Sequence, residues 1–392
     1  MNKTVAQVAE KSPEIITVSE TARTQSKGLK LDEGKRLVSL DAFRGLTMFL
    51  LVAEAARVYH ALQNPALEGT IWGSIVTQFT HHPWNGLRFW DLIQPFFMFI
   101  VGVAMPFAFA RRWERGETWG QSFRHVLYRS AVLLLLGVGL HCIYRGRLVW
   151  ELWNVLAQLS VTYLIAFLLM RKSFTRQIGF TFILLAATEL LYRLWPVPGF
   201  DQPFVKDHNF GSYMDLILMG KINAGGGWVA INFIPTTAHT MWGVLAGYVL
   251  MSDRSHARKI RILITAGLIG VVLGYALDPV TPIIKRICTS SFVIVSGGWC
   301  LLALALCYWL VDVKEKRKWA TFALVVGMNS IFIYLFSNIA GSRMNELVGV
   351  FTFETFGWMG EFGTEVVTAL LALAVFWYVC YWLYQRRAFI KI

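Results

Sequence analysis

Two adjacent histidines are the first candidates for acid–base chemistry. The segment 81–87 reads His-His-Pro-Trp-Asn-Gly-Leu and leads into Asp91. The proline favours an extended conformation at His82, so both imidazoles are held on a turn. A histidine in a partly dry site can act as a general base near neutral pH, and a carboxylate such as Asp91 can fix its tautomer. The alternative is a solvated loop that Trp84 anchors at a membrane interface.

A second polar cluster lies earlier in the chain. Asp41 and Arg44 are three residues apart, so on a helix they share one face and can form an ion pair. Such a pair can simply anchor a helix at an interface. Alternatively, Arg44 can face the phosphate or carboxylate of an anionic ligand. Spacing alone leaves both interpretations open.

Single polar residues within apolar runs are further candidates. Glu54, His239, Asn329 and Ser330 each interrupt a hydrophobic stretch. Ionisable groups at membrane depth are costly and usually functional, so Glu54 and His239 have few purely structural explanations. Ser330 is more simply explained by a hydrogen bond between helices.

The composition determines the elements that must position these residues. The chain has 392 residues, of which 56% are hydrophobic and only 16% are charged, and its mean hydropathy is +0.50. A soluble domain has about 45–50% apolar and about 25% charged residues. Disordered, collagen-like and disulfide-scaffold classes are therefore excluded. The five cysteines show no metal-ligand spacing, so we expect no metal.

Apolar runs of spanning length recur along the chain. A helix needs about 20 residues to cross about 30 Å of hydrocarbon. We therefore predict an all-α, polytopic transmembrane helix bundle with about ten spans. The spans fall at about 43–59, 91–110, 126–144, 152–170, 178–195, 229–250, 261–278, 289–312, 321–340 and 364–385. The segment 196–228 is expected to be irregular or a re-entrant lid.

The basic residues predict the orientation of the bundle. Of the 37 Lys and Arg, 27 fall on one side of the predicted membrane, which places both termini in the cytoplasm. The net charge of +13 is then explained by the orientation of the protein in the membrane, so we expect no nucleic-acid partner. Residues 1–36 lack the apolar core of a signal peptide. They are predicted to be a flexible cytoplasmic tail, and residues 37–392 to be the membrane domain.

Five motifs in one hydropathy pattern resemble the heparan-α-glucosaminide N-acetyltransferase family of transmembrane acyltransferases and its bacterial relatives. The similarity is collinear over about residues 36–392. Its segments are Arg-Leu-Val-Ser-Leu-Asp-Ala-Phe-Arg-Gly at 36–45, His-His-Pro-Trp-Asn-Gly-Leu at 81–87 with Asp-Leu-Ile-Gln-Pro at 91–95, Asn-Val-Leu-Ala-Gln-Leu at 154–159, Thr-Ser-Ser-Phe-Val at 289–293, and Gly-Met-Asn-Ser-Ile at 327–331. Relatives often carry Asn near the outer end of the first spanning helix, where this sequence has Ala-Glu-Ala at 53–55, and Gln94 stands where an apolar residue is common.

The resemblance implies acetyl transfer across a membrane. Acetyl-CoA would donate as co-substrate from the cytoplasm, and an amino sugar or related glycan would accept on the other side. The family's active-site histidine lies three residues before the Trp-Asn-Gly motif, which matches His81. The partners implied are the lipid bilayer, acetyl-CoA and the glycan acceptor. The resemblance leaves undecided whether the protein forms a homodimer. The resemblance to bacterial relatives implies a multi-pass protein of the inner cell membrane.

Each candidate residue takes a role in this hypothesis. His81 is the base, Asp91 orients it, and Asn85 or Asn329 can donate a hydrogen bond to the thioester oxygen as charge develops. The donor-binding residues are predicted to be Asp41, Arg44, Asn329 and Ser330. The acceptor-binding residues are predicted to be Trp84, Glu54 and His239.

Geometry limits the mechanism. The pantetheine arm of CoA reaches about 15 Å, whereas the hydrocarbon core is about 30 Å thick. Either His81 dips inward on a re-entrant loop or the acceptor enters a deep cavity. Transfer can be direct, or it can pass through an acetyl-His81 intermediate. The competing function is a proton-coupled secondary transporter of a sugar or lipid-linked substrate, using the carboxylates of Glu54 and Glu189 and a sixth helix broken at Pro235.

Overall fold

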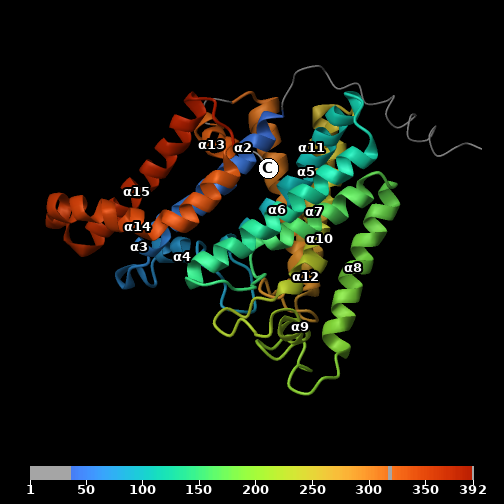
Figure 1. The fold of residues 1–392 in the computed structure, drawn as a ribbon, viewed down its shortest axis with the longest axis horizontal. Helices are drawn as coiled ribbons and strands as arrows, with labels where there is room; N and C mark the ends of the chain where they lie inside the picture. Colours follow the sequence, from blue (N-terminus) through green and yellow to red (C-terminus); the bar gives the residue numbers. More distant parts are fainter. Residues whose placement is uncertain (1–36, 317–319, 391–392) are drawn as a thin grey trace, which may run out of the picture.

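The computed structural model describes residues 37–316 and 320–390. Within these ranges the secondary structure is helical, and no strand occurs among them. The predicted all-α fold is therefore confirmed (Figure 1). The predicted tail, residues 1–36, lies outside the described residues.

The longer helices coincide with the predicted apolar runs, whereas the helices at 71–77 and 210–219 lie between those runs, the second within the segment expected to be irregular. The helices are α2 (Val38–Ala55), α3 (Val58–Ala61), α4 (Ile71–Thr77), α5 (Ile93–Glu114), α6 (Trp119–Arg145), α7 (Val155–Met170), α8 (Phe174–Leu194), α9 (Phe210–Met219), α10 (Phe233–Met251), α11 (His256–Leu277), α12 (Ser290–Tyr308), α13 (Ala320–Met328), α14 (Ser330–Phe356) and α15 (Gly360–Gln385). Short 3-10 turns lie at η1 (Pro65–Leu67), η2 (Phe89–Leu92), η3 (Ala230–Asn232) and η5 (Gly357–Met359), and a π turn, η4 (Trp309–Val313), extends α12.

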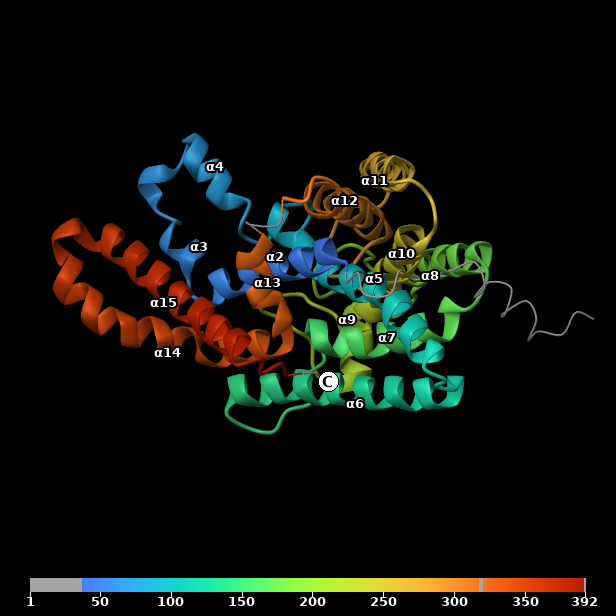
Figure 2. The same cartoon turned by 90° about the horizontal axis from the view of Figure 1, so that it is seen from above.

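Six helical stretches of the described chain are long and apolar enough to cross a membrane. One of them, Ser330–Gln385, contains both α14 and α15. The multi-pass character is supported in this way, whereas the count of ten spans stays a prediction. In the view of Figure 2, α6 and α11 lie at opposite edges of the bundle, and both leave most of their surface unburied, as expected of helices that face lipid.

Two predicted spans have different limits in the structure. The predicted span 321–340 is interrupted at Asn329, where α13 ends and α14 begins. The Asn329 side chain donates to the carbonyl of Ala388 at 3.1 Å and accepts from the amide of Ile390 at 3.0 Å. The predicted span 43–59 ends at Ala55, because Arg57 adopts a left-handed backbone conformation with φ 61°. Hydropathy does not detect the break at Asn329, since the sequence around it stays apolar, whereas Glu54, Arg57 and His60 do mark the end of α2.

Glycines allow the central helices to pack backbone against backbone. A Cβ atom at Gly102 of α5 would collide with the carbonyl oxygen of Thr240 in α10, and one at Gly243 would collide with that of Phe99. Gly45 of α2 is equally close to the backbone of α13. Such small-residue contacts are a common means of helix association in membranes, where dispersion forces replace the hydrophobic effect.

The helices α14 and α15 form a pair that projects from the rest of the bundle. Figures 1 and 2 both show this pair beside α3, at the end of the molecule opposite α8. Large apolar side chains at its far end are exposed in the isolated protein, among them Leu347, Val350, Phe351 and Trp358. A soluble surface rarely carries such a patch, which is consistent with contact to lipid.

We predict that Gly243→Val destabilises the bundle, because the new side chain must force α5 and α10 apart. Overpacking of this kind costs about 1–3 kcal/mol, so the unfolding temperature of the detergent-purified protein should fall by several degrees. Gly139→Val in α6 is the matched control, since nothing lies within 4 Å of a Cβ atom there. Equal unfolding temperatures for the two variants would contradict the proposed close contact.

Candidate functional site

A cavity of about 230 Å³ brings His81 together with residues from distant parts of the chain. The walls come from α2, η2, α5, α7 and α14 and from the loops before η2, α7, η3 and α12. The lining residues are Leu51, Glu54, His81, Trp90, Ile93, Gln94, Phe97, Trp153, Asn154, Val155, Gln158, Trp228, Lys285 and Tyr334. The mixture of aromatic walls and a few convergent polar groups is typical of a small-molecule site.

The carboxylate of Asp91 fixes the histidine loop. One oxygen, Oδ2, accepts the backbone amides of Arg88 at 2.9 Å and of His82 at 3.2 Å. The other, Oδ1, lies 3.0 Å from Nδ1 of His81. The Asp91 side chain is only 1% exposed, whereas that of His81 is 34% exposed. The predicted pairing of His81 with Asp91 is therefore present in the structure, with the imidazole facing the cavity.

A glycine shapes the same loop. Gly86 has φ +137°, and a Cβ atom there would press into the ring of His82. Its amide donates to the carbonyl of Ile283 at 2.8 Å. This bond ties the histidine loop to the segment before α12, which carries Lys285.

Lys285 completes the arrangement around His81. Its Nζ lies 3.1 Å from His81 Nδ1 and 3.7 Å from Asp91 Oδ1, and its side chain is 7% exposed. Because Nδ1 cannot both donate to Asp91 and accept from Lys285, we assign the proton to Nδ1 and the ion pair to Lys285 and Asp91. This tautomer leaves the lone pair on Nε2, for which the described residues offer no hydrogen-bond partner.

The charges around the imidazole keep it neutral. Burial and then the Lys285 cation lower the pKa of His81, the hydrogen bond to Asp91 opposes both effects, and the resulting pKa is about 4. Burial likewise lowers the pKa of Lys285 to about 8, against the attraction of Asp91. At neutral pH the site therefore holds an unprotonated His81 beside a predominantly charged Lys285.

The remaining walls of the cavity can contact the ring of a polar small molecule. The indole of Trp228 meets His81 edge to face, with ring centroids 5.4 Å apart. Glu54 is the one carboxylate among the described lining residues, and it accepts a hydrogen bond from Trp90 Nε1 at 3.1 Å. Gln94 donates to Gln158 across the cavity wall. The cavity thus combines aromatic faces with an accessible acid and amide groups.

Several predicted site residues lie elsewhere. Asn85 is exposed and does not line the cavity. The Trp84 indole donates to the carbonyl of Phe204 at 2.7 Å, so it holds the 196–228 segment in place. His239 is fully buried, with Nε2 2.8 Å from Ser296 Oγ. The structure does not bring these three residues to the cavity around His81.

The predicted donor residues gather at the other end of α2. Arg44 and Asp41 form an ion pair at 3.3 Å, and a Cβ atom at Gly327 would press on the backbone of Asp41. Asn329 and Ser330, which follow Gly327, therefore lie near the start of α2. Asp41 precedes Glu54 by thirteen residues, or about 20 Å along the helix. One helix thus connects the predicted donor end with the cavity.

Sequence reasoning missed Lys285 and the aromatic and amide residues Trp90, Trp153, Gln158 and Tyr334 as parts of the site. Lys285 entered only as a basic residue on the less basic side of the membrane. Its position on that side, next to Arg286 and within an apolar stretch, was the available signal. No sequence pattern links Lys285 to His81, because 204 residues separate them.

Comparison with known proteins agrees with the motif resemblance. No protein-family model matches the chain. The chain is 24% identical over 425 residues to the heparan-α-glucosaminide N-acetyltransferase of Homo sapiens and 24% identical over 421 residues to that of Mus musculus. Each alignment covers 91% of this chain and 60% of the relative, so the chain spans about 60% of their length. The predicted relationship to this family is therefore confirmed.

We predict that Lys285→Met raises the pKa of His81, because burial and Asp91 remain while the neighbouring cation is lost. Diethylpyrocarbonate modifies only neutral imidazole, so the labelling of His81, followed by mass spectrometry, reports its protonation. In the unaltered protein the labelling rate should change little between pH 7 and pH 5, since the pKa lies near 4.

In Lys285→Met the rate at pH 5 should fall about threefold or more relative to pH 7. Lys206→Met, which removes a cation bonded to the carbonyl of Gly225, is the matched control and should leave the profile unchanged. An identical profile for all three proteins would exclude an effect of Lys285 on His81.

Proposed function

We propose that this chain is a membrane acetyltransferase that transfers an acetyl group from cytoplasmic acetyl-CoA to an amino sugar or related glycan on the other side. The observation that carries the proposal is the His81–Asp91 pair, 3.0 Å apart, in a cavity with aromatic walls and one accessible carboxylate. The names of the relatives describe acetyl transfer to the nitrogen of a glucosaminide. That chemistry requires a base near an amine, which is the role we assign to His81.

The acceptor would be held by the cavity walls. The faces of Trp153 and Trp228 can pack against the apolar face of a sugar ring. The carboxylate of Glu54 can accept a hydrogen bond from the neutral acceptor amine, and Gln94 and Gln158 can bond hydroxyl groups. This carboxylate favours an acceptor that offers an N–H donor.

In the transfer step, the neutral acceptor nitrogen attacks the thioester carbonyl carbon. The carbon–sulfur bond breaks and CoA leaves as the thiolate. The proton lost by the nitrogen passes to Nε2 of His81, while Nδ1–H stays bonded to Asp91. His81 then returns that proton to the thiolate, and the imidazole is neutral again. We propose this direct route, in which Asp91 holds the proton on Nδ1 so that the lone pair of Nε2 acts as the base.

Donor binding and topology belong to the same proposal. The Asp41–Arg44 end of α2 would bind the charged part of CoA, with Asn329 and Ser330 nearby. The pantetheine arm, about 15 Å long, would then follow α2 toward the cavity. This arrangement requires both termini in the cytoplasm and about ten spans in the inner membrane, with residues 37–392 as one acyltransferase domain.

His81→Ala should abolish acetyl transfer, with a loss of at least about 100-fold, because general-base catalysis typically contributes that much. The measurement is the formation of N-acetylglucosamine from glucosamine and acetyl-CoA by the purified protein in vesicles. His208→Ala is the control, since that imidazole lies in an outer loop and bonds the carbonyl of Gly199.

Normal acetyl transfer by His81→Ala would overturn the proposed role. Uptake of a sugar into sealed vesicles without acetyl-CoA would instead favour the transporter. The structure gives the transporter no specific support, since the carboxylate of Glu189 is paired with Arg193 at 2.6 Å.

Glu54→Gln should weaken the binding of amino sugars specifically. Loss of a charged hydrogen bond costs about 1.5–3 kcal/mol, so KM for glucosamine should rise at least about tenfold while kcat changes little. Glu361→Gln, an exposed acid on α15 outside the cavity, is the matched control. An unchanged KM for glucosamine would show that Glu54 does not contact the acceptor amine.

A further inference from the structure

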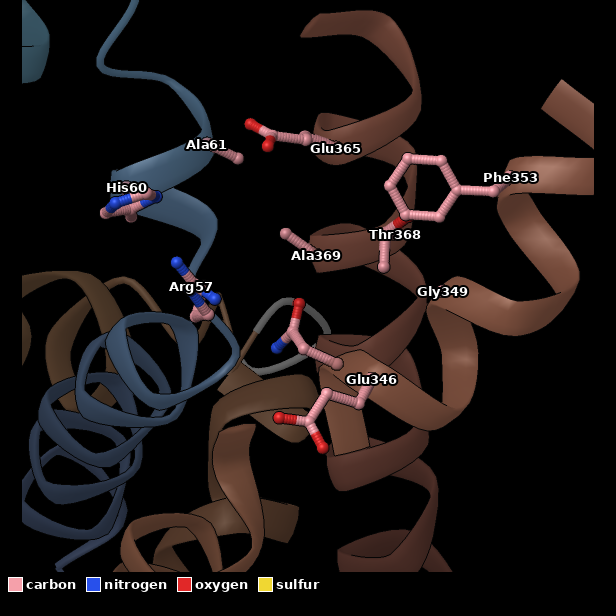
Figure 3. A pocket seen from close by; sticks show the side chains of 10 residues that line it. Arg57, His60, Ala61, Glu346, Gly349, Phe353, Glu365, Thr368 and Ala369 are labelled. Atoms are coloured by element: carbon pink, nitrogen blue, oxygen red, sulfur yellow. The ribbon is translucent and has the colours of Figure 1, made fainter. Parts of the chain in front are cut away.

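A second cavity, of about 200 Å³, lies between α3 and the α14–α15 pair. It shares no lining residue with the cavity around His81. Figure 3 shows the labelled side chains of Arg57 and His60 on one side and those of Glu346 and Glu365 on the other. The proposed acetyl transfer uses none of these residues, so their arrangement needs a separate explanation.

The four charged or titratable side chains face the same space without pairing with one another. Arg57 and His60 come from the segment after α2, Glu346 from α14 and Glu365 from α15. Within the described residues, no ion pair or hydrogen bond links either carboxylate to Arg57 or His60. Two acids and two basic groups thus line one open cavity, each available to an external partner.

The backbone holds this geometry firmly. Arg57 has φ 61° and ψ 19°, a left-handed conformation that residues other than glycine rarely adopt. Its amide donates to Glu54 O at 2.8 Å, and its carbonyl accepts from Ala61 N at 2.9 Å. On the other wall, a hydrogen bond of 2.6 Å between the hydroxyls of Thr352 and Thr368 joins α14 to α15. Both walls are therefore fixed by bonds that do not involve the charged groups.

The cavity lies beside an exposed apolar surface at one end of α2. Arg57 follows that end, opposite the Asp41–Arg44 pair. Phe353 and Ala369 supply apolar lining, and the neighbouring Leu347 and Val350 are exposed. Charged groups beside an exposed apolar surface match the boundary between headgroup and acyl chain.

We propose that this cavity binds the headgroup of a zwitterionic phospholipid that carries a phosphate and a primary ammonium group, as in phosphatidylethanolamine. The phosphate would bind the Arg57 guanidinium, whose planar fork suits phosphate oxygens, with His60 beside it. The ammonium would donate to Glu346 and Glu365, and the acyl chains would lie along Leu347 and Val350. A purely anionic headgroup would leave two carboxylates unmatched, and a choline group has no N–H donor for them.

The test uses the full-length, delipidated protein in detergent and measures lipid binding by native mass spectrometry. The probes are phosphatidylethanolamine, phosphatidylcholine and phosphatidylglycerol with identical acyl chains, together with water-soluble glycerophosphoethanolamine. We expect phosphatidylethanolamine to bind at least about fivefold more tightly than the other two lipids. The double variant Glu346→Gln/Glu365→Gln should lose this preference, whereas Glu354→Gln/Glu361→Gln, on the same helices outside the cavity, should keep it.

Arg57→Gln gives an independent arm, because it should weaken the binding of phosphatidylethanolamine and phosphatidylglycerol alike. Equal binding of the three lipids, or a preference that survives the double variant, would overturn the proposal. Binding of glycerophosphoethanolamine as tight as that of the lipid would assign the cavity to a soluble compound and so exclude a lipid site. If the double variant fails to fold, Arg57→Gln decides the question. The proposal does not rest on acetyl transfer, which is measured separately.

Discussion

The buried carboxylate of Asp91 is the interaction on which the candidate site depends. A charge that is 1% exposed is costly unless each of its oxygens is bonded. Asp91 meets this requirement with two backbone amides, the ring of His81 and the ammonium of Lys285. These bonds fix the start of α5, the histidine loop and the segment before α12 relative to one another. The position of the imidazole is therefore a consequence of satisfying one buried acid.

The neutral state of His81 follows from the same constraint. Lys285 stays near the imidazole because Asp91 attracts it, and its charge then opposes protonation of the ring. The indole of Trp228 and the imidazole meet edge to face, and Lys285 lies 5.2 Å from the centre of that indole. Removal of water strengthens each of these interactions. Lys285 thus both pairs with Asp91 and helps to keep His81 unprotonated at neutral pH.

The sequence predicts the parts of this arrangement that are local. The helices follow from runs of apolar residues, and the His81–Asp91 pair follows from ten residues of separation within one turn-rich segment. The break at Asn329 depends on bonds to residues 388 and 390, so it leaves no hydropathy signal. The exact end of α2 depends on the backbone angle of Arg57. Lys285, Trp153 and Trp228 reach the cavity only through tertiary packing. Single-sequence patterns contain no information about such distant pairs.

Basic residues on the less basic side of the predicted membrane indicate where cavities and ion pairs lie, which a count of charges alone does not show. Because the positive-inside rule disfavours them there, those that remain are expected to be held by specific contacts. Lys285 contacts His81, Arg286 lies over the indole of Trp228, Arg193 pairs with Glu189, and Arg57 lines the second cavity. These four residues determine topology only weakly, yet they mark the cavities and the ion pairs of that side. In a polytopic protein, the minority charges are therefore better guides to sites than the majority that sets orientation.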